Sequence, residues 1–189
     1  TAFYDYADKK LRLSMREAIS RIEEFIGCKF PAGSPEEIKA YEKNHKEQRM
    51  KAIAEEFYHQ QLLQGENLYD FEGGKYTPLN YMLSVRKRKK ESLEEFRVGF
   101  SENYFDLLNI LLAEGYTKEE IKEAKVWVPE GVFVFFYRHP ITKDIVRLNT
   151  KNPFGATYSK KDEFGNRIPG DVIKGYSTGS KSLYFPPNF

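Results

Sequence analysis

Apolar residues recur with a helical period along most of the chain up to Trp127, and with an extended, strand-like pattern after it. In the helical part, Ser or Thr is followed three residues later by Glu, the spacing of a capping box at a helix start. The four pairs are Ser14 with Glu17, Ser34 with Glu37, Ser92 with Glu95, and Thr117 with Glu120. Pro35 and Pro78 follow Ser34 and Thr77, which suits the first helical position. The pattern predicts helices over 14–26, 35–63, 78–89, 92–96, 102–114 and 118–125.

The helix predicted over 35–63 changes character along its length. Its first half has little apolar surface, whereas a core-facing stripe begins at Met50 and continues through Phe57 and Leu62. We therefore expect a solvent-spanning helix that enters the globular body at about residue 50. In the helix over 102–114, the core-forming stripe is predicted to be Phe105, Leu108, Leu111 and Leu112.

The segment 132–137 is nearly all apolar and rich in β-branched and aromatic residues, so it predicts a central strand buried on both faces. Residues 145–148 are expected to pair with it across a turn at 139–144. The segment 153–170 is polar and contains glycine, which indicates a long loop or a mobile β excursion. The fold class that follows is α+β, with a helical N-terminal region, a long helix, and then a small, mainly antiparallel sheet.

Composition limits the classes of function. The 189 residues suffice for one compact domain, or a small domain with an appended element, and the net charge is only +2. The basic residues gather late, since 137–189 holds nine Lys and Arg against four Asp and Glu. Cys28 is the single cysteine, which excludes an internal disulfide and a cysteine-based zinc site. Without an apolar run near the roughly 20 residues that a bilayer requires, we expect a soluble, cytoplasmic protein.

Five consecutive cations, Arg86 to Lys90, lie between two predicted helices. Cations this close repel one another unless water or an anion separates them, so the run is either a solvated face or a site for a polyanion. Shortly after it comes the segment Phe96-Arg97-Val98-Gly99-Phe100. A tyrosine-bearing helix, a basic joint, and a short helix with a Phe-x-x-Gly-aromatic exit therefore follow one another.

This order resembles the N-terminal part of the RNA polymerase core of DnaG-type bacterial and phage DNA primases. The resemblance continues in the Ser14-Met15-Arg16-Glu17-Ala18 segment, which is similar to the last helix of the primase zinc-binding module, and in the phenylalanine-rich strand from Val132. The chain departs from the family where Lys87-Arg88 replaces Gly-Leu and where Asn149-Thr150 replaces the glycines before a groove-lining arginine, here Lys151.

The resemblance implies four parts: 1–28 as the terminal helix of a zinc-binding module, 29–49 as a linker and long-helix start, 50–128 as the helical subdomain, and 129–189 as a β-rich basic subdomain leading to a Toprim domain. In the family that Toprim domain holds Mg²⁺ with an Asp-x-Asp pair, which this chain lacks. We expect a fragment that binds template but does not catalyse, with no cofactor of its own; Mg and Zn are expected in the intact parent protein.

The expected partner is single-stranded DNA, held by cations and stacked on aromatic rings. The predicted nucleic-acid-binding residues are Arg86, Arg88, Arg138, Arg147, Lys151, Lys174, Tyr176 and Lys181. Lys151 and Lys174 are expected to contact phosphate and Tyr176 to stack or position a base, although each could instead be an ordinary surface cation or a packed tyrosine. An alternative is a protein-interaction module that docks a replicative helicase or its loader. A self-contained enzyme is a third alternative, for which the sequence offers no nucleophile, base or metal constellation.

Overall fold

The computed structural model describes residues 4–5, 10–11, 15–27, 34–161, 167–173, 175 and 177–179. The chain divides into two units, Thr1–Glu42 and Lys43–Phe189. The first contains an antiparallel pair of two-residue strands, β1 (Tyr4–Asp5) and β2 (Lys10–Leu11), then α1 (Met15–Ile26) and the start of α2 (Pro35–Gln64). The division lies within α2, inside the predicted linker and long-helix start at 29–49.

The start of α2 forms as the sequence predicts. The Glu37 amide donates to Ser34 Oγ at 3.2 Å, and the Ser34 amide donates to Glu37 Oε2 at 2.7 Å, which satisfies two amides that the helix itself cannot pair. Within the second unit, the buried face of α2 begins at Met50 and continues through Ala54, Tyr58 and Leu62. The prediction that the helix enters the body at about residue 50 is therefore confirmed.

Four antiparallel strands form the main sheet, in the order β10 (Ser177–Gly179), β7 (Ile145–Lys151), β6 (Val132–Arg138) and β5 (Gly99–Ser101). The predicted hairpin and the central place of its first strand are confirmed. Burial of that strand on both faces holds only for its first half, because Phe135 and Tyr137 are half-buried. Because α2 precedes this sheet in the sequence, the fold is α+β as predicted.

The Phe-x-x-Gly-aromatic segment has a structural role. Its last two residues open β5, which lies directly against α2, and a Cβ on Gly99 would approach the Cβ of Tyr58 to 2.7 Å. Only glycine fits this contact between backbones. Phe100 is fully buried beside it.

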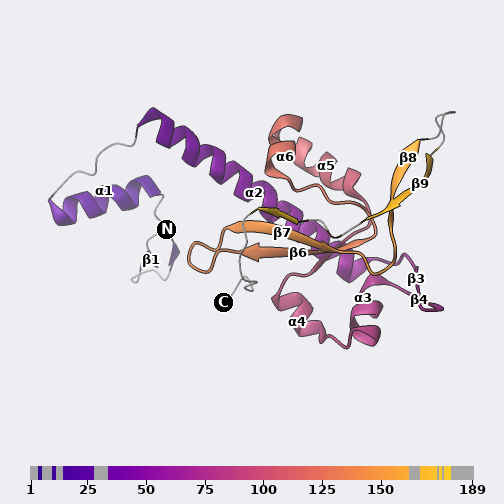
Figure 1. Ribbon diagram of the computed structural model, residues 1–189. Helices are drawn as coiled ribbons and strands as arrows, with labels where there is room; N and C mark the ends of the chain where they lie inside the picture. The colour runs from indigo at the N-terminus through magenta and orange to yellow at the C-terminus, as the bar shows by residue number, and fades with distance from the viewer. Residues whose placement is uncertain are drawn as a thin grey trace. The chain divides into compact units, whose positions relative to one another are not determined.

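One face of the sheet packs on helices. Side chains from α2, from α5 (Tyr104–Ala113) and from α6 (Lys118–Ala124) meet Val134, Phe136 and Leu148 in the first core cluster. Figure 1 shows α5 and α6 on one side of the β6–β7 hairpin, and α3 and α4 on the other. The predicted stripe of α5 is wrong in part: Leu111 is buried, but Phe105 is 58% exposed and Leu107 takes the core position.

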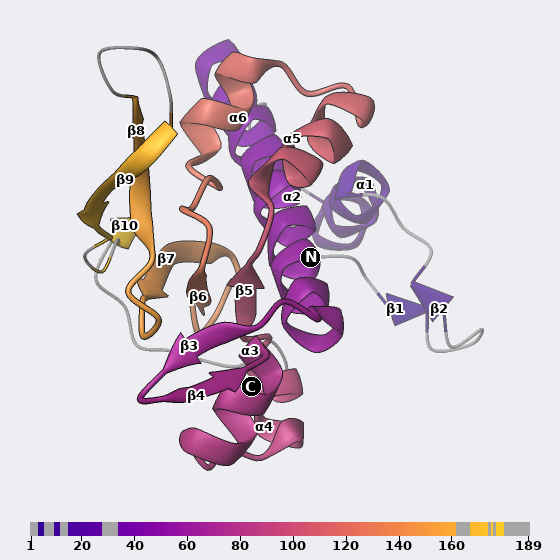
Figure 2. The ribbon, with the colours of Figure 1, turned by 90° about the vertical axis from the view of Figure 1, so that its right-hand side faces the viewer.

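A second core cluster is rich in aromatic rings. It joins Phe100 and Phe133 of the sheet to Tyr81 and to a small hairpin formed by β3 (Tyr69–Phe71) and β4 (Gly74–Tyr76). Figure 2 shows this hairpin beside α3 (Pro78–Asn80) and α4 (Lys90–Glu95). Phe154, a further member, stacks on Tyr69 with 4.9 Å between ring centroids. The sequence patterns did not predict this hairpin or β5.

The continuous helix predicted over 78–89 is wrong. Thr77 caps α3 as expected, but the chain then widens into a π-helical turn, η1 (Tyr81–Val85), and leaves the helix at Arg86. The predicted cap at Ser92 is also wrong, because α4 already begins at Lys90 with Lys89 as its N-cap. The capping box of Thr117 with Glu120 is confirmed, whereas Ser14 lies outside the described residues.

The polar segment after residue 153 contains a hairpin of β8 (Thr157–Lys161) and β9 (Arg167–Val172), so the β excursion is the correct one of the two expectations for it. Asn152 holds its base, because its side-chain amide donates to the carbonyls of Ala156 and Ile173 and its Oδ1 accepts from the Ala156 amide. In the described part of the chain, no helix is long and apolar enough to span a membrane.

Candidate functional site

The face of the β6–β7 hairpin opposite the helices carries alternating aromatic, cationic and amide side chains. The register pairs Phe133 with Lys151, Phe135 with Asn149, and Tyr137 with Arg147. Successive residues of a strand point to opposite faces, so these six share one face. We call this the open face; its members are Phe133, Phe135, Tyr137, Arg147, Asn149 and Lys151. Apart from buried Phe133, they are half-buried or exposed.

A shift in register sets the limit of this face. Tyr137 pairs with Arg147 but Arg138 pairs with Ile145, so Val146 is an extra residue in β7. Because of this bulge, Ile145 and Leu148 both reach the helix-side core while Arg147 stays on the open face. The helix-side face thus packs in the first core cluster, whereas on the open face Phe133 and Phe135 pack in the second core cluster and Arg147, Asn149 and Lys151 are half-buried or exposed.

A groove of about 450 Å³ lies between the open face and the η1 turn. Arg86 and Arg88 reach it from the turn, and Phe135, Asn149 and Lys151 reach it from the sheet. The described residues that line it include no Asp or Glu. Three of the cations predicted to bind nucleic acid therefore meet at one groove, although they are distant in sequence.

The geometry of η1 explains how two arginines of the basic run reach the same groove. The Arg86 amide donates to the Tyr81 carbonyl at 3.0 Å and the Arg88 amide to the Met82 carbonyl at 2.9 Å. Between them Lys87 has a φ of 52°, the left-handed conformation that reverses the chain at a helix end. Lys87 does not line the groove, so the tight turn directs alternate cations toward it.

Arg147 lies next on the same face and is held in place by two contacts. Its Nε donates to Ser177 Oγ at 2.7 Å, and its guanidinium carbon lies 5.7 Å from the centre of the Tyr137 ring. Arginine in this position keeps the terminal nitrogens of its planar guanidinium available for an anion such as phosphate. Arg147 therefore extends the positive surface toward β10.

Arg138 lies elsewhere. Its guanidinium forms an ion pair with Glu55 of α2 and donates to the Lys143 carbonyl at 2.9 Å, and its side chain is only 16% exposed. Burial raises the pKa of the Glu55 carboxyl above its ordinary value, and the charge of Arg138 opposes that rise. The predicted residues Lys174, Tyr176 and Lys181 lie outside the described residues.

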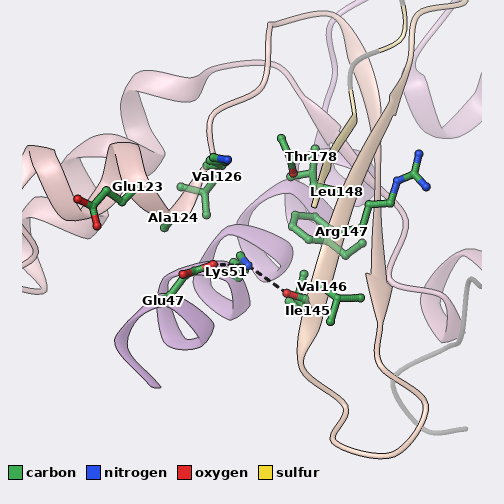
Figure 3. A pocket seen from close by; sticks show the side chains of 12 residues that line it. Glu47, Lys51, Glu123, Ala124, Val126, Ile145, Val146, Arg147, Leu148 and Thr178 are labelled. Atoms are coloured by element: carbon green, nitrogen blue, oxygen red, sulfur yellow. Dashed lines mark hydrogen bonds and ion pairs between the residues drawn. The ribbon is translucent and has the colours of Figure 1, made fainter. Parts of the chain in front are cut away.

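A second hollow of about 260 Å³ lies on the helix side, where α2, the end of α6 and β7 meet (Figure 3). Of the charged residues that line it, Glu47, Lys51 and Glu123 are paired within the protein. Lys51 Nζ lies 2.5 Å from Glu47 Oε1 and donates to the Ile145 carbonyl at 3.1 Å, while Glu123 pairs with Lys43 at 2.7 Å. The mixed charge and internal pairing make this hollow a poor site for a polyanion.

The groove beside η1 differs from this hollow in its electrostatics. Arg86, Arg88 and Lys151 are exposed, and none of them has an ion-pair partner among the residues that the structure describes. Like charges converging on one groove raise its affinity for anions and are screened by salt. Phe135 and Asn149 were not predicted as site residues. The two-residue alternation of the strands could have indicated which residues share a face, but the register that places these two side by side is known only from the fold.

The described residues contain no group of three or more His, Cys, Asp and Glu that could hold a metal ion. The sequence contains three Glu-Gly pairs, and each has a structural position. Glu72-Gly73 forms the turn between β3 and β4, Glu114 caps the end of α5, and Gly131, after Glu130, donates its amide to the Ser101 carbonyl at 2.7 Å.

No protein-family model matches this chain, and no curated protein is detectably similar to it. Its function must therefore be inferred from the groove and the open face.

Proposed function

We propose that this chain is part of a DnaG-type DNA primase, in the cytoplasm, and that it binds and guides single-stranded template along the groove and the open face. The observation that carries the proposal is the meeting of Arg86, Arg88 and Lys151 beside half-buried aromatic rings. Cations alone would suit any polyanion. Cations beside aromatic rings suit a single strand, whose bases are free to stack.

Each residue has a distinct task in this proposal. Arg86 and Arg88 bind phosphate oxygens through the guanidinium, which can form two parallel hydrogen bonds, and Lys151 provides a point charge on the opposite side of the groove. Phe135 and Tyr137 form a surface on which bases can lie. Arg147, held by Ser177, continues the phosphate track beyond the groove.

Synthesis of the primer itself belongs to a part of the primase outside this chain in this proposal. A Toprim domain there would bind Mg²⁺, which neutralises a nucleoside triphosphate, and a zinc-binding module would complete the parent protein. The role of the present chain is to bind the template strand and keep it from dissociating.

The test is single-strand binding, measured by fluorescence anisotropy of a labelled oligonucleotide over a salt series. The variant Arg88→Ala with Lys151→Ala removes two groove cations, and we expect at least about a tenfold loss of affinity. The slope of log K against log salt should become shallower by about 1.4, because each single-strand phosphate contact contributes about 0.7.

The matched control is Lys118→Ala with Lys122→Ala, which removes two exposed cations of α6 and gives the same net charge. It should leave the affinity and the slope nearly unchanged. Equal losses in the two variants would show that binding depends on net charge alone, and absence of binding at low salt would contradict the proposal.

A second candidate function, a protein-interaction module of a replication complex, is favoured by exposed apolar side chains on the helical side. Phe105, Leu112 and Trp127 are 58%, 37% and 42% exposed, and Phe105 and Leu112 lie two turns apart on α5. A replicative helicase is the partner expected in this case. Binding to such a partner that persists at high salt and is lost in Phe105→Asp, without affinity for DNA, would favour this candidate.

A further inference from the structure

The groove contains two asparagines, and only one of them has a structural task. Asn152 is saturated, since its amide and its Oδ1 bond the backbone at the base of the β8–β9 hairpin. Asn149 is half-buried on the open face and lines the groove, and its carboxamide has no hydrogen-bond partner among the described residues. A polar group in this position is suited to bind something that enters the groove.

The neighbours of Asn149 indicate what that molecule is. The register places it directly between Phe135 on β6 and Ser177 on β10, and Arg147 and Lys151 lie two residues away along the same strand. Directly opposed side chains of an antiparallel sheet have Cβ atoms about 4.5–5.5 Å apart. An aromatic ring lies on one side of the amide, and cations lie above and below it.

A nucleotide fits this arrangement. A base that lies flat on Phe135 presents its hydrogen-bonding edge sideways, toward the next strand, where Asn149 stands. The phosphates on either side of that base would then lie near Arg147 and Lys151, which flank Asn149 on β7. The carboxamide then provides a donor and an acceptor side by side, which matches adenine at the edge carrying N6 and N7.

We propose that Asn149 is a specificity-determining residue that reads one base of the bound strand, with a preference for adenine. The inference rests on the proposed function, because it requires a single strand in the groove. The inference adds base recognition to the proposed function, in which the groove binds the strand by charge and stacking. One position of the strand is distinguished from its neighbours by hydrogen bonds.

The test uses four labelled oligothymidylates that differ only in their central base, with binding measured by anisotropy at one ionic strength. The wild-type chain should bind the oligonucleotide with a central adenine about fivefold more tightly than the all-thymidine one, the lower end of the range for a bidentate contact. Asn149→Ala should reduce this ratio to within about twofold without changing the salt slope, because no phosphate contact is lost.

Two further variants sharpen the result. Asn109→Ala makes the same chemical change at an exposed position of α5 and should keep the wild-type ratio. Asn149→Asp offers only acceptors and should shift the preference from adenine to cytosine, whose N4 amino group donates. That shift would identify a reading role even if Asn149→Ala proved unstable.

The outcomes separate the two proposals. Binding without base preference, or a preference that survives Asn149→Ala, would overturn the role of Asn149 and leave template binding in place. Absence of binding by every oligonucleotide at low salt would instead remove the proposed function, and the inference with it.

Discussion

Glu55 and Arg138 form an ion pair in which both side chains are largely buried, with 6% and 16% exposure. Removing one partner of such a pair leaves the other charge without compensation, and typically costs about 3–5 kcal/mol. We therefore expect Glu55→Ala to lower the free energy of unfolding by about 3 kcal/mol or more, measured by urea denaturation. The neighbouring Glu56 pairs with Arg97 but is 53% exposed, so Glu56→Ala should cost about 1 kcal/mol or less. Similar losses in both variants would contradict a special role for the buried pair.

The same carboxyl predicts a pH effect. Its pKa is raised in the folded protein, chiefly by burial, whereas in the unfolded chain it titrates near the ordinary value of 4.5. The folded state then holds a proton more tightly than the unfolded state, and stability falls as pH rises through the folded pKa. The contribution is complete below pH 4.5 and decreases above it. The stability difference between the wild type and Glu55→Gln should shrink as pH rises through this window; a difference that grows with pH would contradict the burial effect.

Single residues also show where sequence reasoning succeeds. The caps at Ser34 and Thr117 were predictable because their partners, Glu37 and Glu120, are three residues away, and the contact depends on nothing distant. Ser92 has the same spacing to Glu95, yet it lies inside α4. The turn after η1 starts that helix earlier, and a local pattern cannot include this constraint.

At the scale of elements, the main surprise is η1. A residue with a side chain costs roughly 1–2 kcal/mol in the left-handed conformation of Lys87, and glycine avoids that cost. Glycine also raises the entropy of the unfolded chain. We expect Lys87→Gly to be neutral or to stabilise by up to about 1 kcal/mol, and Lys87→Val to destabilise by about 1–2 kcal/mol, measured by thermal unfolding.

DNA binding provides the control for this turn. Lys87 does not line the groove, so Lys87→Gly should retain most of the single-strand affinity while it removes one charge of the basic run. A loss as large as that expected for Arg88→Ala with Lys151→Ala would mean that the run binds as a uniform charge, and that the direction of each side chain is unimportant.

Strands were predictable only where they are long. The β6–β7 hairpin was predicted from the segments 132–137 and 145–148, and each of its strands has seven residues in the structure, whereas β3, β4 and β5 have three residues each. Such short strands carry too little pattern to be recognised, and they form because neighbouring strands and the aromatic cluster hold them.

At the scale of the whole molecule, residues predicted as two subdomains, 50–128 and 129–189, lie in one unit, in which β5 from the first pairs with β6 from the second. The sheet has α2, α5 and α6 on one face, and the groove, bounded by η1, on the other. Arg86 and Arg88 were predicted from the run of five cations, and Lys151 from the basic C-terminal third of the chain. Their meeting was not, because it depends on the η1 turn and on the register of β6 with β7.

The central claim is that a single strand binds the open face, and amide chemical-shift mapping tests it most directly. Titration of the isotope-labelled chain with a short oligonucleotide should shift the amides of Arg86, Arg88, Phe135, Asn149 and Lys151. The amides of α5 and α6 should change little. Shifts confined to the helical side around Phe105, or no shifts at low salt, would contradict the claim.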